Sequence, residues 1–151
     1  MAAAGAGIAV DGRVRVGPNR LSGEWGHNPL PWAAADEPAP PCYCGQQGCV
    51  ETLVSGPAIA QDHARLHGGV LTAQQIAAAA EAGDAQAQAT LARWHHRLAR
   101  ALAGVINLLD PDVIVLGGGL SRIASTYRVV PELWTRWVFS GGLREPVRTR
   151  L

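Results

Sequence analysis

The residues best suited to chemistry are three cysteines within eight positions, Cys42, Cys44 and Cys49. Thiolates are soft ligands that favour zinc, and a closed structural zinc site is commonly built from three Cys and one His. Two histidines could complete the set: His27 lies fifteen residues before Cys42, and His63 lies fourteen residues after Cys49 on a predicted helix. An odd number of crowded cysteines is a poor disulfide framework. The cluster therefore predicts either a zinc site or three unused thiols.

A carboxylate and an imidazole stand close together in segment 23–27, which reads GEWGH. Glu24 can accept hydrogen bonds from two hydroxyls, and His27 can use both of its ring nitrogens. This combination suits recognition of a polyol, although an exposed acid and a surface histidine would produce the same pattern. Glu51, two residues after Cys49, is equally ambiguous by itself.

Three consecutive glycines, Gly117, Gly118 and Gly119, follow the apolar run DVIVL at 112–116. Such a run is typical of a buried parallel strand. Glycines after a strand let a ligand approach the backbone closely, and the start of a following helix attracts phosphate. A simple tight turn would need the same residues.

The positioning elements begin with a hairpin at 6–17, predicted because Asp11-Gly12 lies between two β-branched runs. The segment 18–56 is rich in Gly and Pro and contains all the cysteines. A stretch of this length is too long for an idle loop, so we expect it to carry function.

Helical patterns fill most of the rest. We expect four helices, each with a start or stop signal, at 57–67, 72–82, 84–109 and 124–137. The third has one apolar stripe, formed by Leu91, Trp94, Leu98, Leu102, Val105 and Leu109. The order of elements predicts an α/β lobe: a hairpin, an irregular insert, helices, a buried strand, a glycine turn and a last helix.

Composition narrows the classes of partner. The chain of 151 residues has a formal net charge of +1, which does not favour nucleic acid or an anionic membrane surface. It has no apolar run near the roughly 20 residues of a membrane span, and its start lacks the charged region of a signal peptide. We expect one cytoplasmic domain that binds neither nucleic acid nor membrane.

Four segments together resemble the ROK family of sugar kinases, and most nearly its bacterial fructokinases. They read GEWGHNPLPW at 23–32, CYCGQQGCVET at 42–52, SGPAIA at 55–60 and DPDVIVLGGGLS at 110–121. The resemblance implies an actin-like, hexokinase-type (ribonuclease H-like) fold. The whole chain, 1–151, would be its carboxy-terminal lobe, with a zinc-binding and sugar-binding insert at about 18–56.

The resemblance also implies roles for individual residues. Zinc would be structural and held by His27, Cys42, Cys44 and Cys49, while Glu24, His27 and Glu51 would hydrogen-bond a hexose, expected to be fructose. The nucleotide residues would be Gly5 and Gly7, from the end of a phosphate loop, together with Gly117, Gly118 and Gly119. ATP with Mg²⁺ would be the co-substrate, and the intact protein is expected to be a homodimer.

The sequence departs from the family in lacking an Asn-Asp pair, the motif that supplies the catalytic base. We therefore expect a kinase lobe incomplete at both ends and without catalytic residues or activity of its own. Two alternatives remain: the body of a sugar-sensing ROK repressor, or an inactive zinc-binding fragment. The upstream reading frame distinguishes the kinase from the repressor, because a phosphate loop indicates a kinase and a basic winged helix indicates a repressor.

Overall fold

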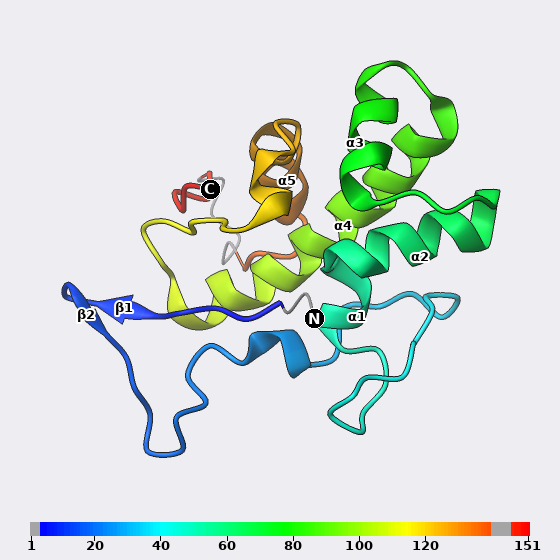
Figure 1. The fold of residues 1–151 in the computed structure, drawn as a ribbon. Coiled ribbons are helices and arrows are strands. Elements are labelled where there is room, and N and C mark those ends of the chain that lie inside the picture. The colour runs from blue at the N-terminus through cyan, green and yellow to red at the C-terminus, as the bar shows by residue number, and fades with distance from the viewer. Residues whose placement is uncertain (1–3, 140–145) are drawn as a thin grey trace.

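The computed structural model describes residues 4–139 and 146–151, and these are mainly helical (Figure 1). Residues 1–3 and 140–145 of the predicted domain lie outside this description. The elements are, in chain order, β1 (Ala9–Val10), β2 (Arg13–Val14), the 3-10 helix η1 (Trp25–His27), α1 (Val50–Val54), α2 (Gly56–His67), α3 (Ala73–Glu81), α4 (Ala85–Leu109), the 3-10 helix η2 (Gly119–Arg122) and α5 (Thr126–Trp134).

The long helix α4 is the centre of the fold, because α1, α2, α3 and α5 all pack against it. In Figure 1 the β1–β2 hairpin projects to the left of the helices, and the irregular segment that contains η1 runs below them. Among the described helices, none combines the length and apolar character needed to cross a bilayer.

The predicted helix signals are confirmed. Asp84 caps α4 by accepting a hydrogen bond from the Ala87 amide at 2.7 Å, and α3 begins with a reciprocal capping box between Thr72 and Gln75. The last predicted helix is shorter than expected, since α5 covers Thr126–Trp134 rather than 124–137.

The apolar stripe of α4 is confirmed over most of its length. Leu91, Trp94, Leu98 and Leu102 are buried, and the Trp94 indole donates a hydrogen bond to the Val54 carbonyl at 2.8 Å. The stripe was wrong at its end: Leu109 is 45% exposed, whereas Ile106 is only 4% exposed. Leu109 lies on the same face as Leu91, because 18 residues at 100° each make five full turns. It is the last residue of α4, and Asn107 and Leu108 are exposed as well, so the burial of the stripe ends with the end of the helix.

The expected buried strand at 112–116 is wrong within the described residues. Its extended backbone makes one isolated parallel bridge, Val113 with Arg150, and Val113 and Val115 are 49% and 83% exposed. A parallel strand is buried only when other strands flank it and helices cover both faces. The part of the chain that the structure describes places no such strands beside it.

The expected hairpin is present as β1 and β2, which pair antiparallel with Ala9 opposite Val14. Asp11 and Gly12 both have positive φ, 53° and 71°, as a type I′ turn requires. The helix α1 was not predicted, because five residues are too few to reveal a period. It lies within the segment expected to be irregular, and it buries Val50, Leu53 and Val54.

Candidate metal centre and its surroundings

The three cysteines and His27 come together as one cluster. Their candidate ligand atoms all lie within 4.8 Å of one another. The Cys44 and Cys49 Sγ atoms are 3.7 Å apart, and the Cys42 Sγ is 3.5 Å from the His27 Nδ1. Around a tetrahedral zinc with ordinary bond lengths, two sulfurs lie about 3.8 Å apart and a sulfur and a nitrogen about 3.6 Å apart. The four side chains therefore fit a closed tetrahedral zinc site.

The backbone forms this cluster from two loops. The amide of Cys42 donates to the Gln46 carbonyl at 2.8 Å, and the amide of Gly45 donates to the Cys42 carbonyl at 3.0 Å. A bridge between Pro29 and Cys49 joins this turn to the segment after η1. Gly45 has a φ of 91°, a conformation that residues with a Cβ rarely adopt.

The pKa values of two thiols are shifted in opposite directions by their surroundings. Cys49 is 1% exposed, and burial raises the pKa of its thiol to about 12. A hydrogen bond from the Gln46 backbone instead lowers the pKa of the exposed Cys44 to about 7. A metal must displace the proton of each thiol that it binds, so occupation of this cluster would release protons.

The alternative fourth ligand, His63, lies elsewhere. It is buried on α2, and its Nδ1 is 2.9 Å from the Thr90 hydroxyl. Among the described residues, His27 is the histidine that lies beside the three thiols.

The acids predicted to bind sugar lie next to this cluster. Glu24 directly precedes η1, and its Oε2 is 4.0 Å from the His27 Nε2, too far for a hydrogen bond. Glu51 is in the first turn of α1, and its Oε2 accepts a hydrogen bond from the Ala4 amide at 3.0 Å. The loop 42–49, called the metal loop below, and its neighbours therefore bring Glu24, His27 and Glu51 into one region.

Tyr43 is the residue of this region that sequence reasoning missed. Its hydroxyl is 2.9 Å from the His27 Nε2, and the two rings meet edge to face with centroids 5.0 Å apart. Desolvation raises the pKa of Tyr43, and the nearby carboxylates of Glu51 and Glu24 raise it further. The phenol of Tyr43 therefore stays neutral. Its position between Cys42 and Cys44 was a signal, but the direction of its side chain depends on His27.

The segment containing Gly5 and Gly7 passes along the same region. The Ala6 amide donates to the Gly23 carbonyl at 2.9 Å. A Cβ on Gly26 would lie 1.8 Å from the Ala4 carbonyl oxygen, so this close approach requires glycine. The structure thus places Gly5 and Gly7 beside the segment that carries Glu24.

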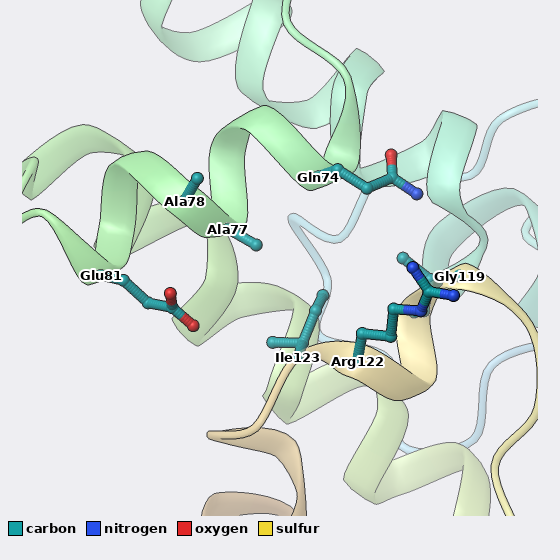
Figure 2. Close-up of a pocket in the computed structure, with 8 residues that line it drawn as sticks. Gln74, Ala77, Ala78, Glu81, Gly119, Arg122 and Ile123 are labelled. Carbon is teal, nitrogen blue, oxygen red and sulfur yellow. The ribbon is translucent and has the colours of Figure 1, made fainter.

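The glycine run forms part of a separate pocket of about 180 Å³, shown in Figure 2. Gln74, Ala77, Ala78 and Glu81 of α3 form one wall, and Gly119, Leu120, Arg122 and Ile123 form the other. Figure 2 shows Glu81 at one end and Gln74 with Arg122 at the opposite end. A Cβ on Gly119 would lie 2.9 Å from the Gln74 Nε2, which is the end of a flexible side chain, so a larger residue here would displace Gln74. Gly117 and Gly118 precede it and have open space around them.

A buried ionic network anchors the chain that leads into the metal loop. Glu37 accepts a hydrogen bond from the Arg97 Nε at 2.7 Å and a second from the Arg100 Nη2. Arg97 also contacts Asp62, and Arg100 donates to the Trp32 carbonyl at 2.9 Å. Burial alone would raise the pKa of Glu37, but hydrogen bonds from Arg100 and Arg97 hold it below its usual value. Sequence reasoning missed this network, whose members lie on α2, α4 and a loop.

The curated proteins similar to this chain include sugar kinases. An N-acetyl-D-glucosamine kinase of Yersinia pseudotuberculosis is 36% identical over 133 residues, which are 85% of this chain and 44% of that protein. The chain therefore spans less than half the length of this relative.

Two solved structures are similar over most of the chain. A ROK hexokinase from Thermus thermophilus superposes with a TM-score of 0.76 at 28% identity, over 97% of this chain and 47% of that chain. A ROK family transcriptional regulator, homologous to the E. coli MLC protein, superposes with a TM-score of 0.72 at 32% identity, over 89% and 36%. The actin-like fold of ROK kinases is thus supported, while the narrower resemblance to fructokinases is not confirmed.

The sequence pattern of the ROK family matches residues 3–150. This chain therefore belongs to the ROK family.

Proposed function

We propose that this chain contributes the hexose-binding and part of the nucleotide-binding surface of an ATP-dependent sugar kinase. The observation that carries the proposal is the orientation of His27. Its Nδ1 faces the thiols, and its Nε2 faces away from them, on the side of Glu24 and Tyr43. One imidazole can therefore serve the metal and a substrate hydroxyl at the same time.

Zinc would have a structural role in this protein. His27, Cys42, Cys44 and Cys49 supply four ligands, so no coordination position is left for a substrate. Bound zinc would fix the loop that carries Tyr43 and the ring of His27, and it would hold α1 beside η1 through Cys49. The sugar-facing groups would thereby be preorganised before a substrate arrives.

Glu24, His27 and Glu51 would recognise the hexose. Both acids can accept hydrogen bonds from sugar hydroxyls, and bonds to charged acceptors are stronger than neutral ones. Glu51 already accepts from the Ala4 amide through its Oε2, which orients the carboxylate and leaves its other oxygen for a hydroxyl.

The pocket at Gly119 supports a nucleotide site. It has apolar walls from Ala77 and Ile123 and polar groups at both ends, an arrangement suited to a flat heterocyclic base. Gly117 and Gly118 would let the rest of the nucleotide approach the backbone. Gly5 and Gly7 are proposed to contact its phosphates, with Mg²⁺ bound to the nucleotide.

The preferred sugar is proposed to be an N-acetylated hexose, with fructose as the second candidate. N-acetylglucosamine comes first because the curated relatives carry that substrate in their names. Fructose rests only on the resemblance of segment 23–32 to fructokinases. The repressor body is a further candidate, favoured by the similarity to the ROK regulator, but the kinase relatives support the first proposal better.

Calorimetric titration of the zinc-loaded chain tests the proposal. We expect saturable binding of N-acetylglucosamine or fructose, no binding of a pentose such as ribose, and separate binding of an ATP analogue. Hexose binding without any nucleotide binding would favour the repressor candidate. Absence of hexose binding, with zinc bound and the chain folded, would refute the proposed sugar site.

A further inference from the structure

The His27 Nε2, to which we assign a sugar hydroxyl, already has a hydrogen-bond partner. The Tyr43 hydroxyl lies 2.9 Å from it, within ordinary hydrogen-bond distance. The carboxylate of Glu24 is also near this nitrogen, but its oxygen is 4.0 Å away. Tyr43 therefore occupies the position that a substrate hydroxyl would need.

Tyr43 and a sugar hydroxyl cannot both accept from the His27 Nε2, because the neutral imidazole has only one proton. When the Nδ1 lone pair points at a metal, a neutral imidazole carries its single proton on Nε2. That N–H can make one strong hydrogen bond, either to the Tyr43 oxygen or to a sugar oxygen. The two acceptors must compete for it.

Tyr43 can leave this position at little structural cost. Its backbone lies between two metal ligands and is held by the turn from Cys42 to Gly45. The residue itself, by contrast, is 72% exposed, and its ring makes an edge-to-face contact with His27. Rotation about the side-chain bonds would free the Nε2 without moving Cys42 or Cys44.

We propose that Tyr43 is a specificity-determining gate over the sugar site. In the sugar-free protein its hydroxyl holds the His27 Nε2–H, and a hexose hydroxyl must replace it for tight binding. The inference rests on the proposed function, because it assigns the substrate to the same nitrogen.

The gate has a consequence for selectivity. A sugar that presents a hydroxyl to His27 replaces the hydrogen bond it breaks, and it can also bond to Glu51 or Glu24. A deoxy analogue without that hydroxyl would have to leave the N–H unpaired or bind around the tyrosine, and unpaired buried donors are costly. Tyr43 would thereby exclude ligands that cannot make this bond.

The test is Tyr43→Phe, which removes one oxygen from an exposed side chain. Without the competing hydroxyl, the dissociation constant for N-acetylglucosamine should fall by about three- to tenfold, the equivalent of one neutral hydrogen bond. Zinc content, measured by native mass spectrometry, should be unchanged. Tyr127→Phe is the matched control, because it makes the same chemical change where the hydroxyl donates to the Ser121 carbonyl at 2.7 Å, and it should not alter sugar affinity.

Imidazole nitrogen NMR of the zinc-loaded, sugar-free chain supplies a second readout. The His27 Nε2 resonance should shift in Tyr43→Phe and stay in place in Tyr127→Phe. Unchanged or weaker sugar binding by Tyr43→Phe would overturn the gate alone, and weaker binding would instead make Tyr43 a direct sugar ligand. If neither the parent chain nor Tyr43→Phe binds any hexose, the proposed function fails and the gate fails with it.

Discussion

The buried network around Glu37 allows a sharp prediction about what fixes the metal loop. Glu37 has an 11% exposed side chain and receives hydrogen bonds from Arg97 and Arg100, whose side chains are 5% and 9% exposed. In Glu37→Gln the amide oxygen can accept from one guanidinium, while the amide NH₂ must face the other, donor to donor. Two buried cations then lose their common counter-charge.

Removing one partner from a buried ion pair typically costs about 3–5 kcal/mol. Arg97 keeps its 3.3 Å contact with Asp62, so we expect Glu37→Gln to fall near the lower end of this range. Because residues 32–37 lead into Cys42, zinc affinity should fall as well. The matched control is Asp36→Asn, which changes an exposed neighbour in the same way and should cost less than about 0.5 kcal/mol.

Urea unfolding of the zinc-loaded chain, followed by tryptophan fluorescence, measures this difference. The network should also give an acid-dependent stability. Because the folded-state pKa of Glu37 and of Asp62 is lowered, their contribution is complete above the unfolded-state pKa of about 4. It is lost as the pH falls through the lowered values. Equal stabilities of Glu37→Gln and Asp36→Asn would refute the anchoring role of the network.

Three further predictions concern the metal, the sugar and catalysis. Native mass spectrometry should find one zinc per chain and much less in Cys44→Ser; a metal-free chain that folds equally well would contradict the zinc site. Glu51→Gln, in a full-length context, should weaken hexose binding by about 1–3 kcal/mol without loss of zinc; loss of zinc with unchanged sugar affinity would make Glu51 a support for the metal. A coupled assay of ADP release should find no turnover by this chain with MgATP and hexose, because the sequence lacks the Asn-Asp pair. The opposite result would be turnover at about 1–100 per second, the usual order of magnitude for kinases, that is abolished by mutating an acid of this chain.

Much of the helical framework could be predicted because its signals are local. Thr72 and Asp84 cap helices through hydrogen bonds to residues three positions away, and the Asp11-Gly12 turn sets its own hairpin. The candidate ligands were equally visible, since three cysteines within eight positions are already close along the chain. These features need little information from distant residues.

The burial of the segment 112–116 could not be predicted from its composition. A run of Val, Ile and Leu indicates a strand, but its burial depends on neighbours that other parts of a chain supply. In the described residues, Ile114 packs against the core while Val113 and Val115 face outward. Tertiary structure therefore decided which of these side chains are covered.

The sequence by itself determined the four longer helices, the hairpin and the set of candidate metal ligands, because each depends on residues near one another in the chain. Only the tertiary structure decided how the candidate site is completed. It turned the His27 Nδ1 to the thiols, brought Tyr43 to the Nε2, and joined Glu37 to Arg97 across 60 positions. Such contacts depend on how helices and loops pack, and residue types along the chain do not specify that packing locally.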